Sequence, residues 1–271
     1  MLGTALMQAC AQAGAQAIGM DLPELDITRY DRLLERMPVC DAVVNCAAYT
    51  NVDQAEVERD LALAVNAKGA GNLARACASR RTRLLHVSTD YVFDGTAGRP
   101  YLEDDPTNPV GYYGVTKLEG EKAVLAATDR CIVMRTQSLF GLNGRNFVLA
   151  ILRRLDAGQE LRVVSDQTSS PTHVAHLSAA ILRLLAAGRF GIVHASAGGS
   201  CSWHEFACAI VARVRPETAV APVKTGEFKT LARRPAYSVL DKSRLAAWTG
   251  FQIPTWQEGL DRYLKEIGRL A

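Results

Sequence analysis

Short apolar segments alternate with longer segments of helical spacing through the first half of the chain, and this alternation limits the possible folds more than any other feature. It predicts strands at 15–20, 41–45, 83–88 and 131–135, with helices at 4–13, 28–37, 55–78 and 113–127. Strands that alternate with helices build a parallel sheet covered by helices on both faces. We therefore expect an α/β fold with a doubly wound parallel sheet, whose strand ends open into a ligand crevice.

The pattern changes after Gly141. Amphipathic spacing predicts helices at 146–157, 178–187, 203–214 and 256–267, with one short strand at 191–195, and the loops between them are rich in Pro, Gly, Thr and Ser. We expect residues 1–140, with a returned strand near 190–195, to form the sheet domain. Residues 141–271 should form a smaller, discontinuous lobe that closes over the crevice.

The overall composition excludes several classes of function. The chain has 31 basic and 28 acidic residues, so its net charge of +3 is too small and too mixed to predict binding to nucleic acid or to a membrane surface. We find no secretory signal and no apolar run of about 18 residues, the length needed to span a bilayer. Seven cysteines at irregular spacing predict free thiols, which places the protein in a reducing compartment, the cytoplasm.

The strongest chemical signal is the segment from Tyr113 to Lys117, Tyr-Gly-Val-Thr-Lys. Residues four apart lie on one face of a helix, so the lysine ammonium is expected beside the phenol, where it lowers the pKa of the phenol from about 10. Such a pair can deliver a proton to a forming alkoxide. By itself the spacing also occurs on ordinary solvated helix faces.

Thr89 gives this pair its context. It lies where the predicted strand 83–88 runs into a loop, and strand ends of a doubly wound sheet point into the crevice. A hydroxyl, a phenol and an ammonium that converge on one point are suited to the reduction of a carbonyl group. The alternative is that Thr89 serves as a cap or turn residue, as Ser88 beside it can.

Several further segments make the sequence recognisable. It resembles the extended short-chain dehydrogenase/reductase superfamily and, within it, the dTDP-4-dehydrorhamnose reductase family, which implies a Rossmann-like dinucleotide-binding domain at 1–140 and a substrate-binding lobe at 141–271. The segments that carry the resemblance occur in the expected order over nearly the whole chain: Asn45–Glu56, Val65-Asn66, Ser88–Gly95, Tyr113–Lys117, Arg135-Thr136, Asn146–Val148, Pro171-Thr172 and Arg234–Asp241.

The resemblance implies NADPH or NADH as cofactor and a nucleotide-linked deoxysugar as substrate, with a homodimer as a further expectation. Tyr113 is then the proton donor, and Lys117 holds the nicotinamide ribose and tunes Tyr113. Thr89 hydrogen-bonds the substrate carbonyl, and Asp90 lies beside it in the substrate site.

The same resemblance assigns the cofactor contacts. Asp26 and Ile27 match a contact near the adenine ring, and the small residues of Ala47-Ala48-Tyr49 match a loop that passes along the cofactor. Asp21 follows the strand predicted at 15–20, where an acid can bind ribose hydroxyls and favour NAD. It can equally cap a turn. Asn66 matches a polar position near the lysine, or bonds its own helix.

Two departures from the family pattern stand out. Ser138 occupies the position where the family usually has a tryptophan that packs against the sugar, so the resemblance does not determine which deoxysugar this chain binds. Gly3 matches only the third glycine of the phosphate-binding turn, and the strand before that turn is absent. We therefore expect a truncated sheet with two unpaired strand edges, and a natural start upstream of Met1.

Other readings remain open at this stage. A nucleotide-sugar epimerase or dehydratase shares the pattern, and a non-catalytic regulatory subunit of the same fold would explain the incomplete phosphate loop. His173 and His176 lack nearby acids or thiols, so no metal site is predicted. Arg233 and Arg234 suit diphosphate recognition, although a surface role is nearly as well supported.

Overall fold

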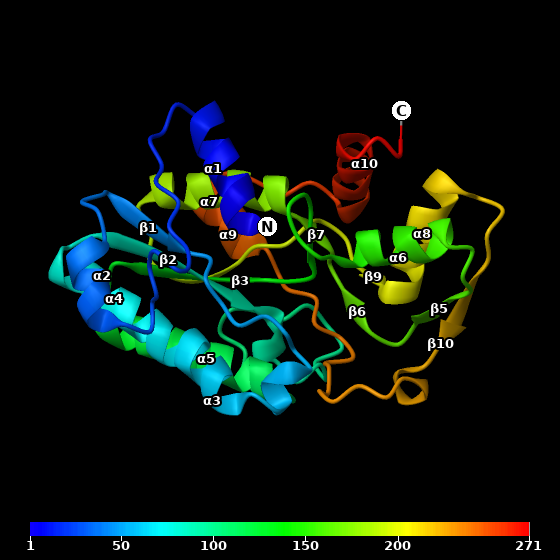
Figure 1. Ribbon diagram of the computed structural model, residues 1–271, viewed down its shortest axis with the longest axis horizontal. Coiled ribbons are helices and arrows are strands. Elements are labelled where there is room, and N and C mark those ends of the chain that lie inside the picture. Colours follow the sequence, from blue (N-terminus) through cyan, green and yellow to red (C-terminus); the bar gives the residue numbers. More distant parts are fainter. Residues whose placement is uncertain (271) are drawn as a thin grey trace.

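The computed structural model describes residues 1–270. Its centre is a four-stranded parallel sheet in the order β1 (Ala42–Asn45), β2 (Arg83–Thr89), β3 (Cys131–Thr136) and β8 (Gly191–His194) (Figure 1). Asn45 pairs with His86, and Thr89 pairs with Thr136. The predicted parallel α/β sheet is therefore confirmed, and the carboxyl ends of β1, β2 and β3 lie along one edge.

Helices cover both faces of this sheet, as the alternating pattern predicted (Figure 1). On one side α4 packs against α5 and α2, with α3 beside α5; on the other side α1 packs against α7, and α7 against α9. Their bounds are α1 (Leu2–Gln12), α2 (Tyr30–Arg36), α3 (Arg59–Leu63), α4 (Ala70–Ser79), α5 (Tyr112–Ala127), α7 (Val174–Ala187) and α9 (Ser243–Thr249).

A second group of elements lies beyond the carboxyl edge of the sheet. It contains α6 (Phe147–Asp156), α8 (Trp203–Val214) and α10 (Trp256–Glu266). Three small two-stranded sheets accompany them: β5 (Leu161–Val164) with β10 (Val220–Val223), β4 (Leu139–Phe140) with β7 (Thr172–His173), and β6 (Thr168–Ser169) with β9 (Cys201–Ser202). The division into domains 1–140 and 141–271 stays a prediction.

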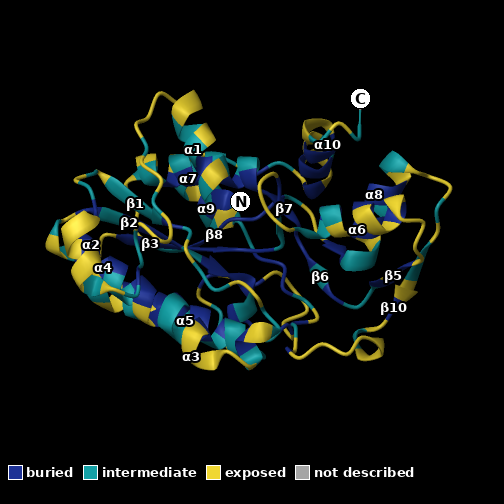
Figure 2. Ribbon diagram, in the orientation of Figure 1, coloured by how far each residue is buried: buried dark blue, intermediate teal, exposed yellow. Residues whose placement is uncertain are grey.

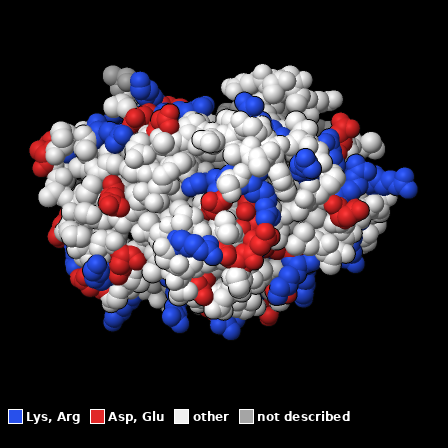
Figure 3. Space-filling view, turned by 180° about the vertical axis from the view of Figure 1, so that it is seen from behind, with Lys and Arg blue, Asp and Glu red and all other residues white. Residues whose placement is uncertain are grey.

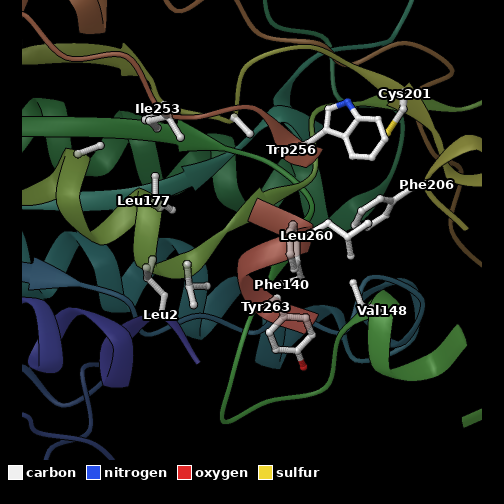
Figure 4. Close-up of a cluster of buried hydrophobic side chains, with 14 of the residues drawn as sticks. Leu2, Phe140, Val148, Leu177, Cys201, Phe206, Ile253, Trp256, Leu260 and Tyr263 are labelled. Carbon is white, nitrogen blue, oxygen red and sulfur yellow. The ribbon is translucent and has the colours of Figure 1, made fainter. Parts of the chain in front are cut away.

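Apolar side chains from both groups of elements meet in one large core (Figure 4). Phe140 lies at its centre, with its ring 5.5 Å from that of Phe206 and 5.8 Å from that of Tyr263. Leu2 of α1 and Leu177 of α7 belong to the same cluster. Figure 2 shows the buried residues concentrated on the sheet and on the inner faces of the helices. The second group is therefore anchored to the sheet by shared burial of apolar surface.

Two predicted elements differ from the structure. Residues 15–20 form no strand, because within residues 1–270 no neighbouring strand lies beside them to complete a ladder. β1 accordingly lies at the edge of the sheet. Two unpaired strand edges were expected, one on each side of the missing strand. Since residues 15–20 form no strand, the structure has one of them, the outer edge of β1.

The helix expected at 55–78 is divided into η1 (Gln54–Glu56), α3, a π-helical segment η2 (Ala64–Gly69) and α4. π-helical turns are rare and often occur at functional sites. The remaining short helices are η3 (Asp90–Val92), directly after β2, and η4 (Thr225–Glu227).

Helix α5 approaches its neighbours closely at two glycines. A Cβ atom on Gly114 would lie 2.2 Å from the carbonyl oxygen of Tyr91, and one on Gly120 would lie 2.2 Å from that of Asn66. Both obstacles are backbone atoms, so they cannot move aside as a flexible side chain can. These contacts fix α5 against η2 and against the segment after β2.

We predict that Gly120→Ala destabilises the protein by about 1–3 kcal/mol, because the added methyl group forces α5 away from η2. Gly226→Ala is the matched control, since no atom lies within 4 Å of the position of its added Cβ. Chemical denaturation of the two variants measures the difference. Equal stability would contradict the close approach.

Candidate active site

The carboxyl end of β2 places Thr89 and Asp90 in the interior. The Thr89 hydroxyl donates to Asp90 Oδ1 at 3.0 Å and accepts from the backbone nitrogen of Tyr91 at 3.2 Å. Both residues are buried, and Asp90 Oδ2 has no hydrogen-bond partner among the described residues. Thr89 thus caps the short helix that follows β2, which is the alternative role considered for it above. Its hydroxyl also lies close to Tyr113.

Tyr113 lies beside Thr89, in the first turn of α5. The Thr89 hydroxyl lies close enough to Tyr113 to favour its ionised form, and the ring of Tyr91 packs edge-on against that of Tyr113 with centroids 5.8 Å apart. One turn further along α5, the Lys117 ammonium donates to the carbonyl of Val87 on β2 at 2.7 Å. Thr89, Tyr113 and Lys117 are therefore gathered at the end of a single strand.

The ionisation of Tyr113 differs from the sequence prediction. Burial, reinforced by the charge of Asp90, raises the pKa of Tyr113 to about 12, although the Thr89 hydroxyl acts in the opposite direction. The prediction that Lys117 lowers the pKa of this phenol is wrong for the protein alone. Lys117 is directed to the Val87 carbonyl instead, and burial lowers its own pKa to about 8 against the charges of Glu121 and Cys46.

A buried ion pair lies behind these residues. The guanidinium of Arg135 on β3 donates to both carboxylate oxygens of Glu121 on α5, at 2.9 and 2.7 Å. Ser88 donates to the same carboxylate, and both charged side chains are at most 3% exposed. Because both oxygens of Glu121 are engaged, this network holds α5 against β2 and β3 at the level of Lys117.

The loop predicted to follow the cofactor comes directly after β1. The backbone of Tyr49 both donates to and accepts from the side-chain amide of Asn66, at 2.8 and 3.0 Å, and Asn66 also donates to Thr116 on α5. Asn66, in η2, therefore joins this loop to α5, the helix that carries Lys117. The alternative role, in which Asn66 bonds only its own helix, is not what the structure has. Ala47 is exposed at the end of the sheet and Ala48 is half-buried.

The start of α1 lies beside the same loop. A Cβ on Gly3 would lie 4.0 Å from the Cβ of Cys46, which immediately precedes Ala47. Small residues on both sides leave room for a bound molecule to approach the backbone, as a dinucleotide requires. The residues present thus fit a dinucleotide at this end of the sheet.

Three other predicted cofactor residues are satisfied locally. Asp21 accepts from the nitrogen of Leu22, and Asp26 accepts from both the nitrogen and the hydroxyl of Thr28. Ile27 is buried in the core beneath α4. Within the described part of the chain, no hydrogen bond or ion pair links these residues with Thr89, Tyr113 or Lys117, so a cofactor role for them stays a prediction.

Ser138 is held in an unusual backbone conformation. Its φ is 48°, in the left-handed region, and its hydroxyl lies 2.8 Å from that of Ser169. Strained non-glycine residues of this kind concentrate at binding sites. Ser238, which sequence reasoning did not single out, lies close enough to Asp90 to favour its charged form.

Arg234 connects this site with a neighbouring cavity. It forms an ion pair with Asp53 at 2.8 Å, in the segment that follows Tyr49, and it lies close enough to Tyr91 to favour the ionised form of that phenol. It also lines a cavity of about 330 Å³. The other cavity walls come from α6, β5, η4 and their surroundings: Phe147, Ala150, Ile151, Arg154, Arg162, Val163, Val164, Gln167, Trp203, Thr225, Phe228 and Thr230. Tyr91 and Arg234 had not been predicted as a pair, because they come from distant segments.

The described residues contain neither a metal-binding cluster nor a membrane-spanning helix. Across residues 1–270, no three or more His, Cys, Asp and Glu side chains gather in an arrangement that holds a metal ion. None of the helices described has the length and apolar character needed to cross a membrane. On the face drawn in Figure 3, acidic and basic side chains lie interspersed.

Known proteins provide the comparison for this geometry. The family described as RmlD substrate binding domain matches residues 1–269. The dTDP-4-dehydrorhamnose reductase of Burkholderia thailandensis is 37% identical over 98% of this chain and 95% of its own length. The chain belongs to this reductase family.

Two further relatives place the chain within the family. The spore coat polysaccharide biosynthesis protein SpsK of Bacillus subtilis is 39% identical over 98% of this chain and 94% of its own length. The crystal structure of dTDP-4-dehydrorhamnose reductase from Bacillus anthracis in complex with NADP superposes with a TM-score of 0.94 at 38% identity, covering 98% of this chain and 95% of that one. The Rossmann-like reductase fold expected from the sequence is therefore confirmed.

The environment of Asp90 predicts a pH-dependent stability. Burial raises the pKa of Asp90 from 3.8 to about 7, with Ser238 and Thr89 opposing. The folded protein thus favours the uncharged acid, and this contribution to stability is complete below about pH 4 and is lost as the pH rises through 7. Asp90→Asn should therefore stabilise the protein more at pH 8 than at pH 5, by roughly 3 kcal/mol at most, because about two pH units of this loss lie between those values.

Asp94→Asn is the control whose effect should be the same at pH 5 and pH 8, because hydrogen bonds from Thr96 and Tyr101 lower the pKa of Asp94 to about 2, and this carboxyl is therefore ionised in the folded and the unfolded protein over that whole range. Chemical denaturation at the two pH values measures both variants. An Asp90→Asn effect that does not change with pH would show that Asp90 stays charged when the protein folds.

Proposed function

We propose that this protein reduces the C4 keto group of a dTDP-linked 6-deoxy-4-ketohexose, with NADPH or NADH as the hydride donor. The observation that carries the proposal is the convergence of Thr89, Tyr113 and Lys117 at the carboxyl end of β2. Membership of the dTDP-4-dehydrorhamnose reductase family supports the same reaction. The product is then a dTDP-deoxysugar, such as dTDP-L-rhamnose for polysaccharide synthesis.

Each residue has a distinct task in this reaction. The nicotinamide, when bound, supplies the hydride. Tyr113 gives its phenolic proton to the carbonyl oxygen as that oxygen gains charge, and Thr89 donates a hydrogen bond to the same oxygen. Lys117 is assigned to the nicotinamide ribose, as the family resemblance implies. The pKa of about 12 keeps Tyr113 protonated until charge develops on the substrate, which suits a proton donor in the direction of reduction.

The cofactor is placed along the loop Ala47-Ala48-Tyr49 and the first turn of α1 at Gly3. The NADP of the Bacillus anthracis relative supports NADPH. Asp21, the residue that would favour NAD, is engaged with its own turn in this chain. Asp26 and Ile27 are assigned to the adenine end on the family resemblance alone.

The nucleotide end of the substrate is placed in the cavity beside Arg234. Trp203, Phe147 and Phe228 offer flat apolar surface for a base, and Arg154, Arg162 and Arg234 offer positive charge for a diphosphate. Tyr91 lies between Arg234 and Tyr113, so the cavity is one side chain away from the reacting centre. Asp90 and Ser138 are assigned to the sugar between these two points.

The setting of the enzyme is also part of the proposal. All seven cysteines are free in the structure, which supports a reducing compartment, the cytoplasm. A homodimer stays a prediction of the family resemblance, and sedimentation of the purified protein tests it.

We predict that Tyr113→Phe lowers kcat by about 100-fold or more, because the substrate oxygen loses its proton donor. Affinity for NADPH should change little, since the ring remains. Tyr112→Phe is the matched control: it is the adjacent tyrosine, and its ring packs under the guanidinium of Arg59 instead. Steady-state kinetics and cofactor titration measure both variants, and full activity of Tyr113→Phe would remove Tyr113 from the mechanism.

We also predict that Arg154→Gln raises KM for the dTDP-sugar by about tenfold with little change in kcat, because it removes binding energy that does not change during the reaction. Arg153→Gln on the same helix is the control, since Arg153 does not line the cavity. If the two variants bind substrate equally well, the nucleotide lies elsewhere.

A further inference from the structure

A buried row of three polar side chains runs from β1 to α5: Asn45, His86 and Lys117. Asn45 Nδ2 lies 3.0 Å from His86 Nδ1, between paired positions of β1 and β2, and His86 Nε2 lies 3.5 Å from Lys117 Nζ. Each side chain is at most 4% exposed. Only the lysine has a task in the proposed reaction, so the reason for the other two must be sought in their contacts.

The orientation of the Asn45 amide is fixed by the backbone. Its oxygen accepts from the nitrogen of Ala47 at 3.1 Å, and the reverse orientation would place two donors against each other. The amide nitrogen therefore faces His86, and the Nδ1 atom must accept the bond. A neutral imidazole that accepts at Nδ1 carries its proton on Nε2.

This tautomer has a consequence for Lys117. The Nε2–H group of His86 is directed at the lysine nitrogen, and an ammonium group is also only a donor. The two groups cannot bond while Lys117 is charged. They can bond when Lys117 is the neutral amine, which accepts from Nε2–H and still donates to the carbonyl of Val87.

A second buried histidine shows the opposite arrangement. His194 Nδ1 lies 3.1 Å from the carbonyl oxygen of Tyr101, which is only an acceptor, so the proton is on Nδ1. Its Nε2 atom then offers a lone pair to Arg135 Nη1 at 3.4 Å. Both histidines face a basic side chain through Nε2, but only His194 has the tautomer that accommodates a cation.

We propose that Asn45 and His86 are positioning residues for Lys117: the amide of Asn45 holds His86 as the Nε2–H tautomer, which favours Lys117 as a neutral amine that can take up and release a proton. The same amide bonds the loop Ala47–Tyr49, so a ligand that displaces this loop also acts on Lys117. The inference rests on the proposed function only for its role in turnover.

The other groups around Lys117 do not replace this effect. Glu121, one turn further along α5, and Cys46, after β1, both favour the charged lysine, whereas burial favours the amine. Tyr113 lies one turn earlier on α5. Burial and Lys117 together keep the pKa of His86 well below its usual range, which agrees with a neutral imidazole.

The first test needs no substrate. Nitrogen NMR of the ¹⁵N-histidine-labelled protein separates protonated from unprotonated ring nitrogens, and single variants assign the signals of the five histidines. We expect the proton on Nε2 in His86 and on Nδ1 in His194. A wild-type His86 with its proton on Nδ1 overturns the proposal, whatever any variant does.

The second test exchanges the tautomer. In Asn45→Asp the carboxylate accepts from Nδ1–H, so Nε2 becomes an acceptor for the Lys117 ammonium. The titration midpoint of Lys117, followed by ¹³C NMR of labelled lysine and assigned with Lys117→Met, should rise by about one pH unit, a tenfold change in the ratio of amine to ammonium. The alkaline limb of the pH profile of kcat/KM should move with it, and His194 should keep its tautomer.

A double variant separates the tautomer from the added charge. His86→Phe combined with Asn45→Asp keeps the carboxylate but removes the imidazole. If Asn45→Asp raises the Lys117 midpoint equally with and without His86, only the charge acts and the proposal is wrong. A wild-type protein with the expected tautomers but no ketosugar reduction would instead overturn the proposed function and leave this inference standing.

Discussion

Two backbone contacts at Gly114 and Gly120 hold α5 against the end of β2 and against η2, and the site depends on them. Tyr113 and Lys117 lie on α5, whereas Thr89 lies on β2, so these contacts set the separation of the reacting groups. They also exclude water from Lys117, and that burial lowers its pKa. A helix displaced by the width of one methyl group would solvate the lysine and separate it from Val87 and His86.

The parts of the fold that the sequence predicted are those determined by local pattern. The strand at 83–88, the strand at 131–135 and the helix at 203–214 each carry their own periodicity, and the structure has them within a residue or two. The strand predicted at 15–20 does not form, because local pattern alone cannot supply the neighbouring strand that its backbone hydrogen bonds need. The π-helical segment η2 was not predicted either, because its alanine-rich sequence is equally compatible with an α-helix.

The candidate site followed the same division. Thr89, Tyr113 and Lys117 were predicted from spacing and resemblance, and the structure gathers them. Tyr91 and Ser238 were not predicted as site residues, because their contribution arises from contacts between distant segments. Arg234 was predicted, with Arg233, only as a residue suited to a diphosphate. His86 lay hidden inside an apolar strand. The raised pKa of Tyr113 was out of reach for a related reason: a sequence gives the spacing of two groups but not the solvent excluded around them.

The geometry also separates the alternatives that the sequence left open. A regulatory subunit has no use for a proton donor, a second hydroxyl and a buried lysine at one strand end, so their assembly favours an enzyme. An epimerase or dehydratase must also take back the hydride that it removes, and the family to which the chain belongs is named for reduction. The departure at Ser138 concerns the sugar and leaves the class of reaction unchanged.

The ion pair between Arg234 and Asp53 joins the two halves of the crevice. Asp53 follows the loop assigned to the cofactor, and Arg234 lines the cavity assigned to the nucleotide. If this ion pair couples the two sites, the coupling is reciprocal: the factor by which one ligand strengthens the binding of the other equals the factor by which it is strengthened. Synergy between dinucleotide and sugar nucleotide would then originate in an ion pair that lies away from the atoms exchanged in hydride transfer.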